Sequence, residues 1–189
     1  MKAMRTRRRI IEAAFRVAER HGLHRLTTSA VVAEAGISTG GFFYHFRTWD
    51  ELVGCMRTEA ASRRAGTVAA RMRTVEGFEA QLREAFHAEL LWASMNPRES
   101  AFLALCRVTP DLPPAPEITE QRSPLARLVA AAGAAGEARP LPAMVLEDLA
   151  ESVLEAAVRR LREDPVLKQK DPLIEQLFSS LLAALAGPR

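Results

Sequence analysis

The sequence lacks the features that mark several large classes of protein. It holds only two cysteines among 189 residues, Cys55 and Cys106, and no CxxC spacing, which indicates neither a disulfide framework nor a zinc site. No apolar run reaches the roughly 18 residues that a membrane helix needs. The basic start MKAMRTRRR is followed by charged residues instead of the apolar core of a signal peptide. We therefore expect a cytoplasmic chain without membrane contact.

Motifs of catalysis and metal binding are scarce as well. The sequence has no P-loop, no HExxH and no carboxylate pair that can be placed in a cleft. His21 and His24 have an i,i+3 spacing, but they straddle Gly22 at the expected end of a helix, which disfavours a metal site. The sequence thus predicts no enzyme, no metal and no cofactor. A cofactor retained on purification would favour an enzyme instead.

Positive charge is concentrated at the amino-terminal end. Residues 1–50 hold nine Lys or Arg and four Asp or Glu, a net charge of +5, while the remaining 139 residues carry −2. A basic end on a mildly acidic body is typical of a protein that meets a polyanion there, although basic ends can also serve solubility alone.

Nearly every segment has helical periodicity, and no alternating run is long enough for a strand, so the sequence predicts an all-α fold. Thr27 can cap a short helix over 28–35 that Gly36 ends, and Ser38 can cap another that extends to about Phe46. The other expected helices lie near residues 5–20, 48–72 and 76–95, after 97, from 124, over 142–161 and from 172, with a stiff proline-rich connection at 109–116.

Two adjacent glycines, Gly40 and Gly41, stand inside the short helix that begins at Ser38, where each costs roughly 1 kcal/mol relative to alanine. Two short helices joined at 36–38 fit a helix-turn-helix, in which the second helix enters the major groove of DNA. Glycines near the start of that helix let its backbone approach base edges and phosphates. A tight αα-hairpin without DNA binding is the alternative on geometry alone.

The aromatic residues that follow the glycines divide between two roles. Helical spacing directs Phe42 and Phe46 toward the core and leaves Phe43 and Tyr44 nearer solvent or DNA. Tyr44 and His45 can donate hydrogen bonds to phosphate.

The same region resembles a known family. The pattern RRIIEAAFRVAERHG, then LTTSAVVAEAGIS, then GGFFYHF and DEL, ending at Leu52, is similar to the amino-terminal domain of the TetR family of bacterial transcriptional regulators. The likeness covers about a quarter of the chain. Val32, Phe43 and Trp49 depart from the residues usual in the family, and the last two remove a hydroxyl and a cation that commonly touch phosphate in relatives.

The resemblance implies a helix-turn-helix DNA-binding domain over 1–50 and a helical effector-binding and dimerisation domain over 51–189. It implies a regulator, usually a repressor, that binds a palindromic operator as a homodimer and is released by a small effector. The DNA-binding residues expected on this basis are Arg5, Arg7, Arg8, Thr27, Thr28, Ser29, Ser38, Thr39, Gly40, Gly41, Phe43, Tyr44, His45 and Arg47.

The second domain is expected to hold the effector and the dimer interface. An apolar lining favours a hydrophobic effector, with the expected contacts Phe86, His87, Leu90, Trp92, Met95, Phe102 and Met144, each of which could instead be plain core. The last two helices carry broad apolar faces, and the dimer residues expected on them are Leu146, Leu149, Val153, Ala157, Ile174, Leu177, Phe178 and Leu181. Packing of these faces within one chain is the alternative.

A helical adaptor that dimerises and binds protein is the remaining rival function. In that case the basic first helix would be ordinary surface charge. Salt dependence separates the two functions, because phosphate contacts make DNA affinity fall steeply as salt rises.

Overall fold

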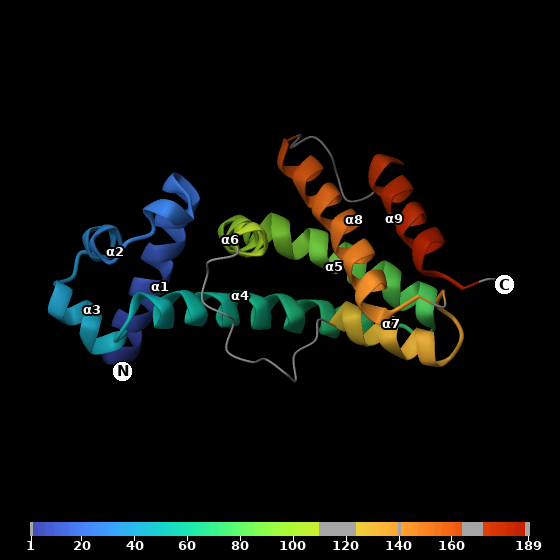
Figure 1. Ribbon diagram of the computed structural model, residues 1–189, viewed down its shortest axis with the longest axis horizontal. Helices are drawn as coiled ribbons and strands as arrows, with labels where there is room; N and C mark the ends of the chain where they lie inside the picture. The colour runs from blue at the N-terminus through green and yellow to red at the C-terminus, as the bar shows by residue number, and fades with distance from the viewer. Residues whose placement is uncertain (1, 110–123, 140, 164–171, 188–189) are drawn as a thin grey trace. The chain divides into compact units, whose positions relative to one another are not determined.

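Helices account for nearly all of the structure. The computed structural model describes residues 2–109, 124–139, 141–163 and 172–187 (Figure 1). Within these ranges the only strand-like contact is one antiparallel bridge between Ala138 and Ala186, and the predicted all-α fold is confirmed. None of the described helices is both long and apolar enough to span a lipid bilayer. The proline-rich connection predicted at 109–116 falls, beyond its first residue, outside the described ranges.

The helix boundaries follow local signals in the sequence. Gly22 and Gly36, with φ of 75° and 60°, end the first two α-helices in conformations that glycine adopts without strain. Every helix predicted from the sequence is present. The elements are α1 (Lys2–His21), the short 3₁₀ turn η1 (Leu23–Arg25), α2 (Thr28–Ala35), α3 (Thr39–His45), α4 (Trp49–Met72), α5 (Phe78–Met95), α6 (Pro97–Val108), α7 (Pro124–Ala134), α8 (Ala143–Glu163) and α9 (Pro172–Leu185).

The chain divides into two compact units. The first comprises residues 1–61 and 96–117, and the second comprises 62–95 and 118–189. Helix α4 contributes to both, with its residues up to Ala61 in the first unit and the remainder in the second. The functional division at residue 50 expected from the sequence is a different boundary, and it stays a prediction.

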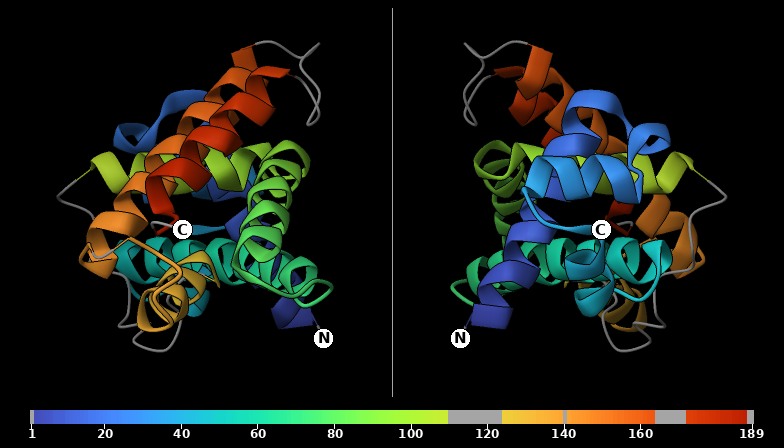
Figure 2. Two further views of the ribbon diagram at one scale, coloured as in Figure 1. Left: turned by 90° about the vertical axis from the view of Figure 1, so that its right-hand side faces the viewer. Right: turned by 90° about the vertical axis from the view of Figure 1, so that its left-hand side faces the viewer.

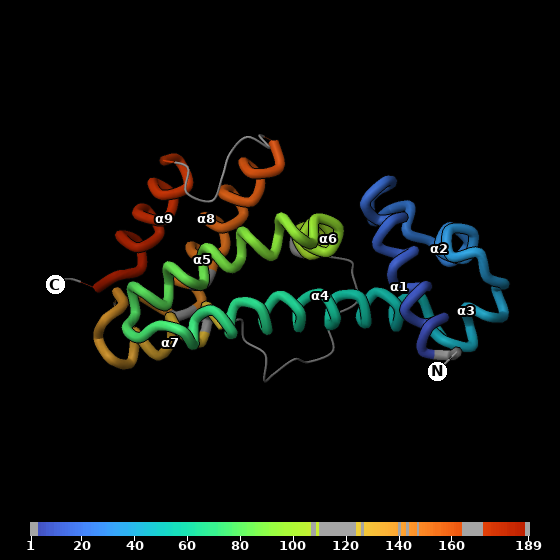
Figure 3. Tube along the Cα trace, turned by 180° about the vertical axis from the view of Figure 1, so that it is seen from behind, coloured from blue at the N-terminus to red at the C-terminus, as the bar shows by residue number. Residues whose placement is uncertain are grey.

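The core of the first unit is formed by α1, α2, α3 and the start of α4, with α6 packed on α1. In the trace of Figure 3, α2 leads through a short turn into α3. Phe42 and Phe46 of α3 are fully buried, as predicted, and Met56 of α4 is buried with them. Phe102 of α6 meets Phe15 of α1 edge-on, with 5.3 Å between the ring centroids. These aromatic contacts fix the orientation of the short helices.

The core of the second unit lies among α5, α7, α8, α9 and the end of α4, and Figure 2 shows α8 and α9 side by side. One ion pair is buried in this unit. Arg64 of α4 places Nε 2.8 Å from Oε2 of Glu89 on α5, whose residue surface is only 6% exposed. The Glu151 carboxylate of α8 lies 3.8 Å from the same guanidinium. Removing one partner would leave an uncompensated charge, which is why such pairs are strongly destabilising to break.

Candidate nucleic-acid interface

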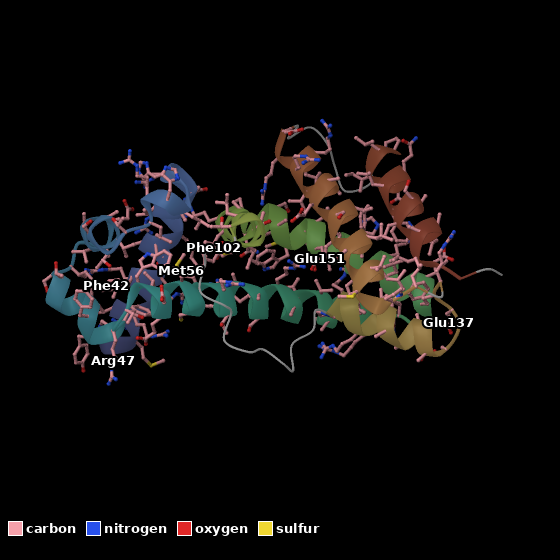
Figure 4. All side chains as sticks on the ribbon, in the orientation of Figure 1. Phe42, Arg47, Met56, Phe102, Glu137 and Glu151 are labelled. Carbon is pink, nitrogen blue, oxygen red and sulfur yellow. The ribbon has the colours of Figure 1, made fainter. Side chains whose placement is uncertain are left out.

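Helix α3 is held by its cap and by one buried face. Ser38 has an extended backbone, and its Oγ accepts a hydrogen bond from the Gly41 N–H at 3.0 Å, as an N-cap should. Phe42, labelled in Figure 4, and Phe46 anchor the inner face in the core of the first unit. The outer face of the helix is consequently fixed without being covered.

That outer face presents polar and aromatic groups to solvent. Tyr44 is 80% exposed and Phe43 is 48% exposed, which confirms their predicted direction. The ring of His45 packs edge-on against Tyr44 at 5.0 Å, and Arg47, just after the helix, projects outward (Figure 4). Thr39 and Gly40 are exposed at the start of the same helix. A hydroxyl, an imidazole and a guanidinium therefore extend from one rigid element of the first unit.

The two adjacent glycines differ in how much space surrounds them within the chain. Neither Gly40 nor Gly41 has a positive φ, so backbone conformation does not demand glycine at these positions. A Cβ added at Gly40 would meet nothing within 4 Å, whereas one at Gly41 would lie 3.2 Å from the Ser38 Oγ. At Gly40 the missing side chain therefore leaves bare backbone facing outward, which suits the close approach of a partner.

Helix α2 is clamped to α1 by charged contacts. Thr27 caps α2 by accepting the Ala30 N–H at 3.3 Å. Arg16 and Arg20 of α1 both donate to the Glu34 carboxylate, at 2.6 and 3.0 Å. The hydrogen bond from Arg16 is the largest of the effects that hold the pKa of Glu34 below its usual value, against a smaller opposing effect of burial.

The turn after α2 is held by another arginine of α1. Arg9 donates to the Gly36 carbonyl oxygen at 2.9 Å, which satisfies an acceptor at the turn between the two short helices. Thr28 is half-buried in the first turn of α2, and Ser29 is exposed with its hydroxyl 3.1 Å from the Thr27 hydroxyl. The predicted DNA contacts of α2 thus lie at its amino-terminal end.

The start of α4 is tied to the segment before α2. Thr48 Oγ1 accepts the Glu51 N–H, and the Glu51 carboxylate accepts the Arg47 N–H at 2.8 Å, a variant of the capping box. Trp49, half-buried, donates from Nε1 to the Leu26 carbonyl oxygen at 2.5 Å. The position where relatives usually carry a lysine therefore serves an internal hydrogen bond here.

The three arginines of α1 that are expected to contact DNA differ in their surroundings. Arg5 is exposed and has no side-chain partner among the described residues. Arg8 pairs with Glu12 one turn later at 2.9 Å. Arg7 donates to the Cys55 Sγ at 3.0 Å and lies over the Phe46 ring, 4.9 Å from its centroid. Arg7 thus connects α1 to α4 inside the chain, and a DNA contact from it stays a prediction.

Residues 36–40, GISTG, also match the letters of the GxSxG nucleophile motif. That motif needs a serine on a strand-to-helix turn with its hydroxyl free for attack. Here Ser38 is preceded by α2 and its Oγ accepts a backbone N–H as a helix cap, so the context of the motif is missing. Within the described residues no cluster of three metal-ligating side chains is found either.

Comparisons with known proteins identify the kind of domain that contains α2 and α3. A family model described as "Bacterial regulatory proteins, tetR family" matches residues 10–54, the stretch from α1 into the start of α4. Residues 10–54 are therefore a TetR-family DNA-binding domain. TetR-family members are DNA-binding transcriptional regulators without enzymatic activity, and the arrangement of α2 and α3 is their helix-turn-helix. The recognition from the sequence is confirmed, and so is the expectation that the chain is not an enzyme.

Solved structures extend the likeness of fold to the whole length of the chain. A TetR-family protein from Shewanella sp. PV-4 is 23% identical, covers 97% of this chain and 99% of its own, and has a TM-score of 0.85. A TetR-family transcription regulator from Marinobacter aquaeolei VT8 is 16% identical, with coverages of 97% and 96% and a TM-score of 0.84. One from Haemophilus influenzae is 19% identical, with coverages of 98% and 99% and a TM-score of 0.78. No curated protein matches the sequence.

The residues expected to bind an effector differ in their burial. Phe86, Leu90 and Trp92 are buried, while Met95 and Met144 are 71% and 70% exposed. Phe102, expected beside them, is instead part of the core of the first unit, where its ring packs on Phe15. Phe102 takes this place because α6 packs on α1, and its contact with an effector stays a prediction. His87 is half-buried, and burial lowers its pKa although the nearby Glu175 carboxylate raises it.

The residues expected at the dimer interface also separate into two groups. Five of them fill the core of the second unit within one chain: Leu146, Ala157, Ile174, Phe178 and Leu181. Their part in a dimer interface stays a prediction. Val153 and Leu177 are half-buried at the edge of that core, and Leu149 is 38% exposed. Periodicity finds the apolar face of a helix, but it cannot distinguish the part that the same chain covers.

Several contacts at the interface were not anticipated from the sequence. The hydrogen bonds Trp49 to Leu26 and Arg9 to Gly36 each join residues more than 20 positions apart. The one signal for the first was that tryptophan replaces the family's lysine at position 49. An open hollow beside the start of α2 was not predicted either, although its lining includes His21 and His24, whose i,i+3 spacing bears only on metal binding.

Proposed function

We propose that this TetR-family protein is a repressor that binds a palindromic operator as a homodimer and leaves it when a small apolar effector binds. The observation that carries the DNA-binding part is the outer face of α3, where Tyr44 is 80% exposed and Gly40 leaves bare backbone with open space beside it. A buried inner face and an uncovered outer face are what a major-groove reading helix requires.

A second copy of the chain would explain the apolar groups left uncovered on α8 and α9. Leu149 and Val145 of α8 are 38% and 39% exposed, and Leu173 of α9 is 40% exposed. Ser180 and Ala184 continue the outer side of α9 with small side chains that allow close approach of another helix. Two-fold symmetry would place two recognition helices about 34–36 Å apart, or a multiple of that distance, which matches a palindromic site.

The second unit supports the effector part of the proposal. Its described helices surround an apolar core, in which Leu82, Phe86 and Leu90 of α5 are almost fully buried. Helix α4 runs without interruption from this unit into the unit that contains α3. An effector that prefers one conformation of α4 by about 1.4 kcal/mol would lower DNA affinity tenfold.

The test is a fluorescence anisotropy titration against duplex DNA from immediately around the protein's own gene, compared with scrambled duplexes. Two variants change the outer face of α3. Tyr44→Ala removes an exposed hydroxyl and ring, and Gly40→Glu places a carboxylate where backbone should meet DNA. We expect each to weaken specific binding at least tenfold, as the loss of about 1.4 kcal/mol requires.

The Gly40 position supplies its own control for folding. Because the site has open space around it and lies in the first turn of a helix, Gly40→Ala should stabilise the protein by about 0.5–1 kcal/mol, and Gly40→Glu should not destabilise it. Lost binding with unchanged urea unfolding would assign the effect to DNA recognition. Wild-type protein that prefers no duplex over a scrambled one at low salt would overturn the proposal and favour an adaptor.

A further inference from the structure

An open hollow of about 610 Å³ lies where α1, η1 and α2 meet in the first unit. It is lined by His21, His24, Arg25, Thr27 and Ala30. Gly22, with φ of 75° and ψ of 172°, turns the chain here, and the His24 imidazole folds back over it, 3.1 Å from where a Cβ would stand. Two imidazoles, a guanidinium and a hydroxyl thus converge on one concave surface from a short stretch of chain.

The basic groups around this hollow differ from four other arginines near α1 and α2 that are neutralised by glutamates. Arg8, Arg16, Arg20 and Arg98 each pair with a glutamate at 3.0 Å or less. By contrast, the side chains of His21, His24 and Arg25 have no acidic partner among the residues that the structure describes, and no Asp or Glu lines the hollow. The local charge is therefore free to attract an anion.

The donors of the hollow suit the geometry of a phosphate group. A guanidinium can give two parallel N–H bonds to phosphate oxygens, and each imidazole keeps at least one N–H donor. Since Thr27 Oγ1 takes the Ala30 N–H, the amides of Thr28 and Ser29 in the first turn of α2 are left without an intrahelical acceptor.

We propose that this hollow holds one backbone phosphate of the bound DNA, with Arg25 and His24 as its main contacts and His21 at its edge. Because the contact is to phosphate, it adds affinity without reading sequence. The proposal rests on operator binding by α3 and adds a contact by residues outside the helix-turn-helix pair. Thr27, at the start of α2, lies between the two regions and connects them within the first unit.

Salt-dependent DNA binding tests the proposal. Log affinity is measured against log salt for wild type, Arg25→Gln and the double variant His24→Gln with Arg25→Gln, on the operator and on a scrambled duplex. Each phosphate contact contributes about 0.9 to the slope, so the double variant should lose about one unit of slope. Its affinity should fall roughly five- to tenfold near 0.1 M salt, equally on both duplexes.

Two further variants serve as controls. Arg25→Lys keeps the charge and should retain most of the slope. Arg73→Gln removes an equally exposed arginine from the end of α4 in the second unit and should leave the slope unchanged. All four substitutions are at exposed positions, so their urea unfolding should match that of wild type within about 0.5 kcal/mol.

The possible results separate this proposal from the proposed function. Wild-type operator binding with an unchanged slope in the double variant would overturn the phosphate site while leaving the repressor intact. A loss confined to the operator would also overturn it, because that would indicate base reading. If inorganic phosphate raises the melting temperature of wild type but not of the double variant while the DNA slope stays unchanged, the hollow binds a free phosphate and the proposed source is wrong.

Discussion

At the scale of single residues, Phe43 and Trp49 replace residues that commonly contact phosphate in relatives, and each replacement has its own consequence. Phe43 lacks the hydroxyl that relatives commonly offer to phosphate, but Tyr44 beside it is more exposed and carries one. Trp49 replaces a cation with an indole that holds the Leu26 carbonyl, one residue before the cap of α2. We therefore expect the phosphate contacts to come from Tyr44, His45 and the arginines, while Trp49 holds the segment before α2 in place.

The hydrogen bond of Trp49 can be removed alone. Trp49→Phe keeps an aromatic ring but leaves the Leu26 carbonyl, on a residue only 2% exposed, without this donor. We expect a loss of about 1–3 kcal/mol in the free energy of unfolding, the usual cost of an unsatisfied buried group. Urea unfolding followed by circular dichroism measures it. Tyr44→Phe, which removes an exposed hydroxyl, should show no loss, and equal stability of both variants would contradict the role of Trp49.

At the scale of elements, the two short helices depend on α1 for their position. An isolated helix of seven or eight residues is unstable in water, so α2 and α3 need caps and tertiary contacts to persist. Thr27 and Ser38 supply the caps, and Arg16, Arg20 and Arg9 of α1 supply ionic and polar contacts. The caps could be recognised from the sequence because they act within three residues. The arginine contacts could not, since they connect positions 14 to 27 residues apart.

The clamp on Glu34 makes a prediction about pH. The folded-state pKa of Glu34 is lowered, so its contribution to stability is complete above the unfolded value of about 4.5 and disappears as pH falls through the folded value. Glu34→Gln should therefore be less stable than wild type at pH 7, and the difference should shrink below pH 4.5. Urea unfolding at pH 7, 5, 4 and 3 provides the measurement.

The exposed ion pair between Arg8 and Glu12 serves as a control for this effect. Glu12→Gln breaks the exposed i,i+4 contact with Arg8, which should contribute little at any pH. If Glu34→Gln and Glu12→Gln lower the free energy of unfolding by the same small amount at every pH from 7 to 3, the contacts of Arg16 and Arg20 with Glu34 do not stabilise the first unit.

At the scale of the whole molecule, the two units differ in how completely they bury their apolar residues. The first unit buries its large side chains around α1, whereas α8 and α9 of the second unit retain a partly exposed apolar side after filling their own core. Such a side favours a partner helix surface, and small residues allow the backbones to approach.

A single charged substitution on α8 tests the dimer interface that we propose for the second unit. Leu149→Arg places a cation on the exposed side of α8, where burial against a second copy would leave it unpaired. We expect the variant to become monomeric in sedimentation at micromolar concentration and to lose operator affinity. Leu141→Arg adds the same charge at a residue that is 44% exposed just before α8 and should stay dimeric. A monomeric wild type, or a dimeric Leu149→Arg, would contradict this interface.

The sequence by itself determined the features that act over short distances along the chain. Helical periodicity, the caps at Thr27, Ser38 and Thr48, and glycine at positions 22 and 36 predicted the helices and the helix-turn-helix, because each signal operates within about one turn. The burial of Phe42 and Phe46 and the exposure of Tyr44 followed from the same period.

Only the tertiary structure decided what covers each apolar face and which charges are paired. It moved Phe102 into the core around α1, assigned Leu146 and Phe178 to the core of a single chain, and gave Trp49 an internal partner. These outcomes depend on contacts between residues distant in sequence, which periodicity and capping signals do not encode.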